Sequence, residues 1–499
     1  MIKGSTSTDR ILIADLMERS GVRFGTSGAR GLVTDMSDRV CYAYTAGFIQ
    51  YLESTGELSR KDRRIAVAGD YRSSTDRIMT AVGKAVIDRG YLPVNCGKIP
   101  SPAVALYGIR QRIPAIMVTG SHIPDDRNGI KYNKGTGEIL KFDETGIKEQ
   151  TVVVPDHFSP TGMFKEEQTL GVVVDEAHEF YVRRWLDAYP SGCLAGKSIG
   201  VYEHSAVGRD LLYRIYTDLG AEVTQLGRAE KFVPVDTEAI RPEDVTLASE
   251  WMKEHDFDTI VSTDGDGDRP LISDERGRWI RGDVAGILTA QYLGADVVVT
   301  PVSCNTAVEK SGLFQEVRRT GIGSPYVIEE MDRAVDDGAR CVVGYEANGG
   351  FLTASSVPME RGILEPLPTR DPVVVHLSVI CLSIDKGLPI SELLLSLPQR
   401  YTASDRLKEF PQEKSRSGIN ELITGGGSAI EEMFPDFGSV KHTDTTDGLR
   451  ITFDNDEILH LRPSGNAPEL RCYTEAASES RAWEINRMGI RALERWRGR

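Results

Sequence analysis

A buried strand, a helix and a second buried strand recur three times along this 499-residue chain. Each copy ends in a polar loop that contains glycine. The six apolar runs that define the copies are residues 65–68, 116–118, 199–202, 258–261, 296–300 and 341–343. Such alternation is typical of parallel β-α-β units, so the sequence predicts three similar α/β domains. At about 150 residues per domain, the length leaves room for roughly one more.

Helix signals lie between these runs. From Val40 the apolar residues follow a helical stripe over residues 40–52. Ser74 or Thr75 can cap a second helix that ends at Gly90, and a third helix is expected near residues 207–219.

The pattern changes after about residue 395. Residues 449–453 and 458–461 alternate between apolar and polar side chains, and turns are expected at 447–448 and 454–455. This predicts antiparallel hairpins with one solvated face. A helix rich in Arg and Glu follows from about Ser478. The chain should therefore end in a separate α+β domain, with a linker near the turn at residues 387–389.

Charge and cysteine content exclude several classes of protein. With 59 basic and 74 acidic residues the net charge is −15, which argues against nucleic acid or an anionic membrane as the main partner. The chain contains no apolar run of about 18 residues, and its start is too polar for a secretory signal, so we expect a cytoplasmic protein. Seven scattered cysteines without a Cys-x-x-Cys pair predict reduced thiols rather than disulfides or a zinc site.

The first polar loop presents a serine. Ser121 lies between Gly120 and His122, directly after the apolar run 114–118, and Lys131 follows a second turn. This arrangement is typical of a nucleophile or phosphate carrier at the carboxyl end of a strand, although a plain connecting loop has the same composition. The other two loops, residues 262–269 and 344–350, occupy equivalent places, which suggests one shared cleft.

The second loop contains Asp264, Asp266 and Asp268 at alternate positions, separated by glycines. Their oxygens can converge on a hard divalent cation. A calcium loop is an alternative, because Glu275 stands at its twelfth position, but the sixth is Arg269 rather than glycine and a strand precedes the motif. A phosphatase with an aspartate nucleophile and a solvated acidic turn are further alternatives.

Two segments carry the features of phosphate binding. Residues 22–31 contain three glycines and two arginines, which suit an anion but also a glycine-rich hairpin. Residues 462–471 begin and end with arginine and include Ser464 and Asn466. Several charge-assisted donors in one turn favour a phosphate dianion over a plain surface turn.

These four motifs, in this order, resemble those of the α-D-phosphohexomutases, the phosphomannomutase and phosphoglucomutase superfamily. The resemblance covers nearly the whole chain, from Gly25 to Arg471. It implies a heart-shaped α/β protein with three similar mixed-sheet domains and a C-terminal α+β domain. We place these domains at residues 1–168, 169–278, 279–395 and 396–499.

The resemblance also implies a role for each motif residue. Ser121 is the phosphorylated serine and holds Mg²⁺ together with the three aspartates, while the distal phosphate is bound by the C-terminal loop. The catalytic set is Ser121, His122, Lys131 and Arg30; the metal set is Ser121, Asp264, Asp266 and Asp268; the substrate-binding set is Arg269, Glu346, Asn348, Arg462, Ser464, Gly465, Asn466 and Arg471.

The chain departs from the family pattern at two loops. Gly120 and Ile123 replace a common alanine and the usual asparagine beside Ser121. In the sugar-binding loop, Asn348 replaces a serine and the family's histidine is absent. The hexose could therefore be mannose, glucose or glucosamine, and a phosphoglucosamine mutase is the alternative to a phosphomannomutase or phosphoglucomutase.

The expected reaction moves phosphate between O1 and O6 of a hexose through phosphoserine and a hexose 1,6-bisphosphate, which also serves as activator. Lys131 or Arg30 would accept the hydroxyl proton, and the ordinary pKa of arginine makes Lys131 the easier base. A Mg²⁺-dependent sugar phosphatase and a non-catalytic sugar-phosphate-binding protein are more remote alternatives. The partner is a small hexose phosphate, and the protein is expected to be a monomer or small homo-oligomer.

Overall fold

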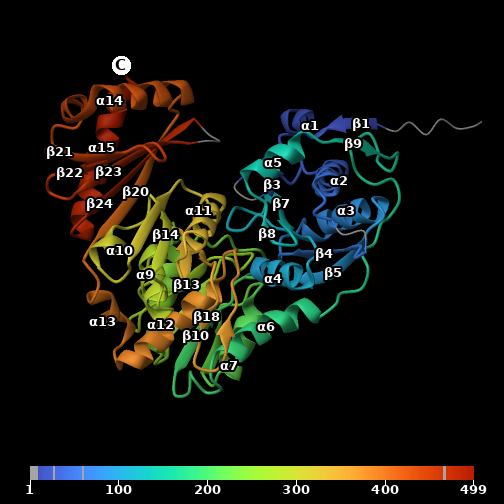
Figure 1. The fold of residues 1–499 in the computed structure, drawn as a ribbon, viewed down its shortest axis with the longest axis horizontal. Helices are drawn as coiled ribbons and strands as arrows, with labels where there is room; N and C mark the ends of the chain where they lie inside the picture. The colour runs from blue at the N-terminus through green and yellow to red at the C-terminus, as the bar shows by residue number, and fades with distance from the viewer. Residues whose placement is uncertain (1–8, 26–27, 59–60, 465–467, 499) are drawn as a thin grey trace, which may run out of the picture.

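A computed structural model of the protein describes residues 9–25, 28–58, 61–464 and 468–498. Four larger β-sheets, each with its own helices, follow one another along the described chain and form an arc (Figure 1). The first sheet and the last lie at the two ends of the arc, and the second and third lie between them. Three mixed-sheet domains and a different C-terminal domain are therefore present, as predicted.

The first sheet has the order β2-β3-β7-β6-β4-β5, with β8 paired to β7. Its strands are β2 (Arg23–Phe24), β3 (Gly28–Leu32), β4 (Arg64–Gly69), β5 (Leu92–Lys98), β6 (Ala115–Val118), β7 (Arg127–Lys134) and β8 (Gly137–Glu138). Its main helices are α2 (Asp38–Thr55), α3 (Thr75–Asp88) and α4 (Ser101–Gln111). Nearly every apolar residue of the α2 stripe is buried, and Ser37 caps the helix by accepting a hydrogen bond from Val40 N–H.

Smaller elements close the first domain. A two-stranded sheet joins β1 (Asp9–Leu12) to β9 (Thr151–Val154), and the helices α1 (Ile13–Ser20) and α5 (Lys141–Lys148) pack beside α2.

The second and third sheets repeat one four-strand arrangement. The second, β10 (Ser198–Tyr202), β11 (Glu222–Leu226), β12 (Thr259–Thr263) and β13 (Pro270–Ile272), has the order β11-β10-β12-β13. The third, β14 (Val297–Pro301), β15 (Glu316–Thr320), β16 (Val342–Tyr345) and β17 (Phe351–Thr353), has the order β15-β14-β16-β17. In each, two parallel pairs are followed by one antiparallel pair.

The first sheet contains the same arrangement as β5-β4-β6-β7. The three predicted loops all join the third of these strands to the fourth, between β6 and β7, β12 and β13, and β16 and β17. The repeat inferred from the apolar pattern is therefore confirmed, and its loops occupy equivalent positions.

One hydrophobic cluster crosses the first three domains. It includes Ala66 of β4, Val201 of β10 and Val298 of β14. The helices that carry most of the shared core are α4, α6 (Glu176–Ala188), α7 (Arg209–Asp218), α9 (Gly282–Tyr292) and α12 (Pro372–Lys386). Trp185 of α6 is completely buried in it. Because these domains share a core, their loops are held in a fixed relation to one another.

Helices α8 (Pro242–Glu254) and α11 (Ser324–Asp336) pack on separate small clusters of the second and third domains. The short elements α10 (Ala307–Lys310), β18 (Val357–Pro358) and β19 (Ile363–Leu364) complete the third domain.

The fourth sheet is antiparallel, with the order β20-β24-β23-β22-β21. Its strands are β20 (Tyr401–Lys408), β21 (Val440–Asp444), β22 (Leu449–Phe453), β23 (Ile458–Pro463) and β24 (Glu469–Ala476), and its helices are α14 (Gln412–Met433) and α15 (Glu479–Arg497). The predicted hairpins and the final helix, capped by Ser478, are confirmed.

Two details of that domain differ from the sequence analysis. His460 on the expected solvated face of β23 is only 2% exposed, because this face meets the loop of residues 302–304 of the third domain around a small cavity. The turn at residues 387–389 separates α12 from α13 (Ile390–Leu395), which packs on α12, and the chain enters the fourth sheet only at Tyr401.

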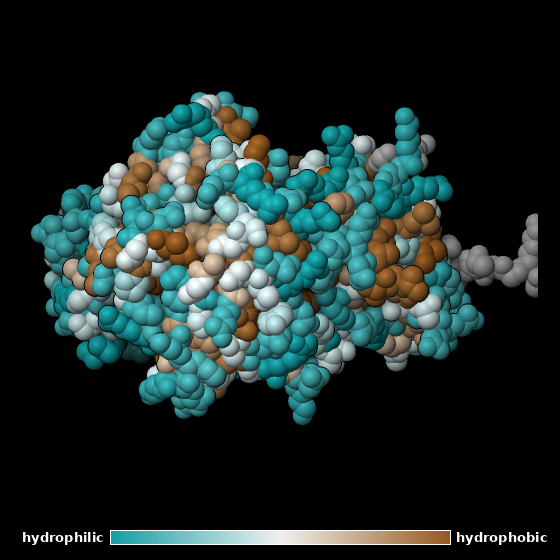
Figure 2. Space-filling model, turned by 90° about the horizontal axis from the view of Figure 1, so that it is seen from below, coloured by the Kyte–Doolittle hydropathy of each residue, from teal (hydrophilic) through white to brown (hydrophobic). Residues whose placement is uncertain are grey.

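The face seen from below carries mostly hydrophilic side chains, with hydrophobic side chains in patches between them (Figure 2). All seven cysteines are free thiols, as predicted, and five of them are buried. Among the described helices, none is both long and apolar enough to cross a membrane.

Candidate active site

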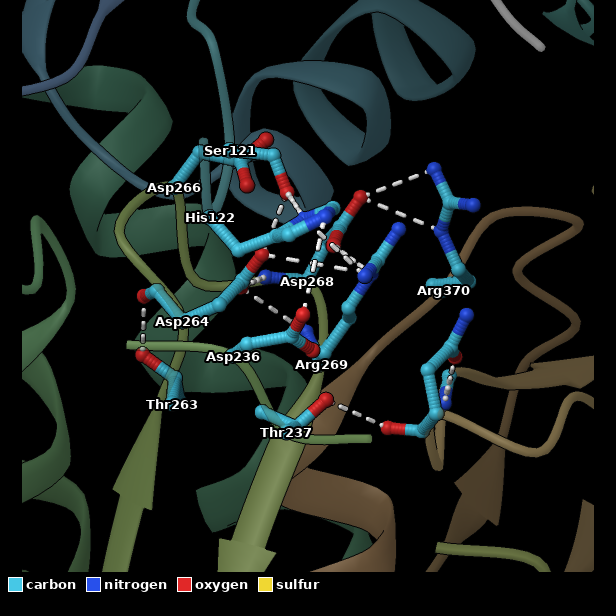
Figure 3. A network of polar contacts seen from close by, with 12 residues as sticks. Ser121, His122, Asp236, Thr237, Thr263, Asp264, Asp266, Asp268, Arg269 and Arg370 are labelled. Carbon is cyan, nitrogen blue, oxygen red and sulfur yellow. Dashed lines mark hydrogen bonds and ion pairs between the residues drawn. The ribbon is translucent and has the colours of Figure 1, made fainter. Parts of the chain in front are cut away.

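Ser121 lies in the loop between β6 and β7 and points its hydroxyl at the loop between β12 and β13 (Figure 3). Its Oγ donates a hydrogen bond of 2.5 Å to Asp264 Oδ2, and the residue is 1% exposed. Its φ of 57° is in the left-handed region, which costs free energy for a residue with a side chain. The fold therefore holds this serine in one strained, buried position beside the acidic loop.

The three aspartates of the acidic loop converge. One oxygen from each of Asp264, Asp266 and Asp268 lies within 4.8 Å of the others. Asp266 Oδ1 and Asp268 Oδ1 are buried and have no hydrogen-bond partner among the described residues. Buried oxygens without a partner are costly, and a hard divalent cation would satisfy them.

The approach of the two loops requires a glycine between the first two aspartates. A Cβ on Gly265 would lie 2.7 Å from Ser121 O, which is closer than van der Waals contact permits. Glu275, which made a calcium loop conceivable, lies elsewhere, because its carboxylate accepts hydrogen bonds from Ser391 at the start of α13. The calcium-loop alternative is therefore not supported.

Basic side chains surround the acidic loop. Lys131 Nζ donates to Asp266 Oδ2 and to Asp268 Oδ2, both at 2.6 Å. Arg370, which precedes α12, donates from Nε to Asp268 Oδ2 at 3.1 Å and from Nη1 to Glu346 Oε2 at 3.1 Å. Arg269 Nε lies 3.8 Å from Asp268 Oδ1. Three buried carboxylates thus face three cations.

The pKa values reverse the order expected for the two candidate bases. Burial acts to lower the pKa of Lys131, but attraction to Asp266 and Asp268 outweighs it and raises the pKa above its ordinary value. The pKa of Arg30 is lowered to about 10, mainly by burial and further by repulsion from Arg269. The side chain of Arg30, on β3, has no hydrogen-bond partner among the described residues.

The surroundings shift the pKa values of the three aspartates in opposite directions. Burial, together with the charges of Asp266 and Asp268, raises the pKa of Asp264 well above its ordinary value. Burial has the same tendency at Asp266, but Lys131 outweighs it and lowers the pKa of Asp266. Arg370 likewise lowers the pKa of Asp268. A metal-free site thus has one carboxyl that resists ionisation.

His122 is held as a neutral ring. Its Nδ1 accepts a hydrogen bond of 3.0 Å from Arg269 Nη1 and lies 3.3 Å from Ser121 Oγ. Burial and the charge of Arg269 lower its pKa to about 3. His122 can therefore orient Arg269 and the serine, but it carries no charge near neutral pH.

The third loop joins the same site. Glu346 is 5% exposed and is bound by Arg370, which links it to Asp268 of the second loop. Asn348 is bound on both sides: its Oδ1 accepts from Gly350 N–H, and its carbonyl oxygen accepts from Thr237 of the second domain. The three repeated loops therefore meet, as the sequence indicated.

The C-terminal loop is separate from this cluster. Arg462 Nε donates to Asp447 Oδ1 at 2.8 Å, Ser464 is 4% exposed, and Arg471 Nη1 lies 3.4 Å from Tyr473 Oη. Gly465 and Asn466 lie outside the described residues. Within the described chain, no hydrogen bond joins Arg462 or Arg471 to the serine or acidic loops.

Three further residues, which no motif in the sequence marks, contact the site. Arg370 bridges Asp268 and Glu346, Ser101 Oγ donates to Asp266 Oδ2 at 2.5 Å, and Arg72 binds the serine loop. Ser101 lies between two prolines at the start of α4, and Arg370 lies two residues before the proline that begins α12; this was the available signal. Such positions are common, so these two residues could not be selected from the sequence.

Four protein-family models match the chain in the order of its domains. Their descriptions are phosphoglucomutase/phosphomannomutase alpha/beta/alpha domain I (residues 21–152), domain II (189–277) and domain III (281–401), and the C-terminal domain (416–488). Together these matches contain every motif of the candidate site.

Relatives align with the chain over almost its whole length. A phosphomannomutase of Salmonella muenchen is 43% identical over 471 residues, which are 94% of this chain and 95% of that protein. A phosphomannomutase of Sinorhizobium fredii is 39% identical over 475 residues, or 95% and 99% of the two chains. The crystal structure of a phosphoglucomutase/phosphomannomutase family protein from Burkholderia thailandensis has the same fold, with a TM-score of 0.71 at 19% identity over 94% and 96% of the two chains.

Proposed function

Because the chain belongs to the phosphoglucomutase/phosphomannomutase family, we propose that it interconverts a hexose 1-phosphate and the matching hexose 6-phosphate. Mannose phosphates are the substrates we favour, since two relatives with about 40% identity are named phosphomannomutases. Glucose phosphates are the second candidate substrates. Glucosamine phosphates are the alternative, because the sugar-binding loop departs from the family pattern.

The observation that carries the proposal is the buried contact between Ser121 Oγ and Asp264, 2.5 Å apart, inside a ring of carboxylates and cations. A serine that only stabilised the loop would not need a strained backbone and a place beside three converging aspartates. A phosphate on Ser121 would instead lie beside Lys131, Arg269 and the acidic loop, where these cations and an ion held by the aspartates would offset its charge.

Mg²⁺ fits the acidic loop, because its donors are all carboxylate oxygens and two of them are buried without a partner in the described chain. Asp264, Asp266 and Asp268 would hold the ion together with the phosphate on Ser121. Bound there, it would neutralise charge on the phosphoryl group during transfer.

In the proposed cycle, phosphorylated Ser121 gives its phosphoryl group to the free hydroxyl of the sugar. The serine O–P bond breaks, a sugar O–P bond forms, and the hydroxyl proton passes to a base. The resulting hexose 1,6-bisphosphate turns around in the cleft and returns its other phosphate to Ser121. Added bisphosphate would activate the enzyme by phosphorylating this serine.

We favour Arg30 over Lys131 as the proton acceptor. Arg30 has its pKa lowered to about 10, whereas Lys131 is bound by two carboxylates that raise its pKa. A partly buried cation that is destabilised by neighbouring arginines gives up its proton more readily than one in an ion pair.

The rest of the substrate would be oriented by the other two loops. Glu346, fixed by Arg370, offers a carboxylate to sugar hydroxyls, and Asn348 lies beside it. Arg462, Ser464 and Arg471 would bind the phosphate that is not reacting. Such binding raises the rate by holding the hexose in line with Ser121.

A coupled assay tests the proposal. Purified protein with Mg²⁺ should convert mannose 1-phosphate to mannose 6-phosphate, faster with added glucose 1,6-bisphosphate, and release little inorganic phosphate. Ser121→Ala should have a kcat at least about 10³-fold lower than wild type, and its intact mass should lack one phosphate. Ser54→Ala is the control and should behave as wild type, because the Ser54 hydroxyl donates to Tyr51 O within the same helix.

Three outcomes would contradict it. Rapid release of inorganic phosphate would indicate a phosphatase, and binding without turnover would indicate a sugar-phosphate-binding protein. Near-normal turnover of Ser121→Ala would exclude the phosphoserine route. Comparing mannose, glucose and glucosamine phosphates in the same assay identifies the hexose.

A further inference from the structure

The guanidinium of Arg72, which follows β4, is completely buried beneath the serine loop. All five of its N–H groups can be assigned to acceptors. Four of the acceptors are carbonyl oxygens of the loop and its end. The contacts are Nη2 to Ser121 O (2.8 Å) and Ile123 O (2.5 Å), Nη1 to Pro124 O (2.7 Å) and Arg127 O (3.0 Å), and Nε to Asp70 Oδ2 (3.2 Å).

Asp70 holds the other side of the serine. Its carboxylate pairs with Arg72 and accepts a hydrogen bond of 2.7 Å from Thr119 Oγ1. Thr119 Oγ1 in turn accepts a hydrogen bond of 2.7 Å from Ser121 N–H. The buried pair thus fixes both the N–H and the C=O of Ser121, and these contacts compensate for its left-handed φ of 57°.

The residues around Arg72 pack closely against its guanidinium. The face of its guanidinium lies 4.0 Å from the ring centroid of Phe232, in the second domain. A Cβ on Gly120 would lie 2.6 Å from Arg72 Cζ, so the guanidinium occupies the space that an alanine side chain would need. This accounts for glycine at position 120 of this chain.

Phe232 also connects Arg72 to the acidic loop. A Cβ on Gly265 would lie 2.9 Å from the Phe232 ring, so this ring packs against the loop of the three aspartates as well. Arg72 therefore lies between the loop that presents Ser121 and a side chain that contacts the cation-binding loop.

We propose that Arg72, oriented by Asp70, is a positioning residue that holds Ser121 at the geometry for phosphoryl transfer. It contacts neither the hydroxyl of Ser121 nor the three aspartates, so it acts through the backbone of the loop. The inference rests on the proposed function, because the geometry matters only if Ser121 carries the phosphate.

Two variants test this role. Arg72→Lys keeps the charge beside Asp70 but offers fewer and differently placed donors, and Arg72→Met removes them all. A displacement of about 1 Å at a reacting group can reduce the rate roughly 100-fold. We expect Arg72→Lys to lower kcat for hexose 1-phosphate by roughly 10- to 100-fold while KM changes less than about threefold, since the substrate-binding arginines are untouched.

Arg77→Met is the matched control. Arg77 also belongs to the first domain and also pairs with an aspartate, Asp38 at 2.7 Å, but it does not touch the serine loop. Its loss should lower thermal stability without changing kcat. A purely structural role of Arg72 would give the same result in Arg72→Lys.

A second measurement does not depend on turnover. Hydrogen exchange in a peptide covering residues 119–127 should be faster in Arg72→Lys than in wild type, and unchanged in Arg77→Met. If wild type shows no mutase activity, the proposed function fails while this measurement still tests Arg72. Two results would overturn the inference. One is hydrogen exchange in this peptide that is the same in Arg72→Lys as in wild type. The other is a folded Arg72→Lys whose kcat is within twofold of that of an active wild type.

Discussion

Replacing Lys131 by methionine should destabilise the metal-free protein, and Mg²⁺ should restore most of the loss. The Lys131 ammonium binds two buried carboxylates at 2.6 Å, Asp266 and Asp268, whose side chains are 0% and 2% exposed. Removing one partner of a buried ion pair costs roughly 3–5 kcal/mol. Ser101 and Arg370 still contact these carboxylates in the variant, so we expect a loss of stability at the lower end of this range, about 3 kcal/mol.

Thermal unfolding in EDTA measures this loss. For a unit of 150–250 residues, 1 kcal/mol shifts Tm by about 2–4 °C, and the shift is smaller for a larger unit such as three domains that share a core. The variant should therefore unfold below wild type by at most roughly 6–12 °C. An ion at a hundred times its Kd adds about 2.7 kcal/mol. Mg²⁺ should raise the Tm of the variant more than that of wild type, because no ammonium then competes for the carboxylates.

Lys134→Met provides the control on the same strand. Lys134 lies 3.1 Å from the buried Asp143, away from the acidic loop, and its side chain is 12% exposed against 10% for Lys131. Its variant should also lose stability in EDTA, but Mg²⁺ should not restore it. The reasoning fails if Lys131→Met unfolds within about 1 °C of wild type in EDTA, or if Mg²⁺ raises the Tm of both variants equally.

The remaining predictions concern the C-terminal loop and a buried histidine. Arg462→Ala should raise KM for the 1-phosphate and the 6-phosphate alike and lower kcat/KM by roughly 10- to 150-fold. Arg462→Lys should recover part of this loss. An unchanged kcat/KM in Arg462→Ala would exclude a role of Arg462 in binding the phosphate that is not reacting. Burial lowers the pKa of His376 to about 3, so the unfolded chain takes up a proton below about pH 6.5 that the folded chain does not. The free energy of unfolding should therefore fall by up to about 1.4 kcal/mol per pH unit as the pH drops from 6.5 towards 4. Chemical denaturation at pH 7 and pH 5 measures this fall, which should be smaller in His376→Gln than in wild type.

The order of strands and helices was predictable because its signals are local. Apolar runs such as residues 65–68 and 116–118, the helical stripe after Val40 and the alternation in residues 449–453 each became the expected element. The failure at His460 has a tertiary cause. Its strand face is covered by the third domain, and a single strand's pattern does not show what packs on it.

The chemistry of the site was predictable where one short motif carries it. Asp264, Asp266 and Asp268 are neighbours in sequence, so their convergence needs only a tight loop with glycines. The choice between Lys131 and Arg30 was not predictable. It depends on the charges that surround each side chain after burial, and these reversed the ordinary order of the two pKa values.

The sequence by itself thus determined the three repeated units, the fourth domain of different type, and the loops that carry the serine, the aspartates and the glutamate, because periodicity, turns and short motifs act over a few residues. Only the tertiary structure decided which side chains meet across those loops. Lys131 and Asp266 are 135 positions apart, and Arg370 lies 102 positions beyond Asp268. Contacts over such separations exist because the first three domains share one core, which fixes the distance between their strand ends.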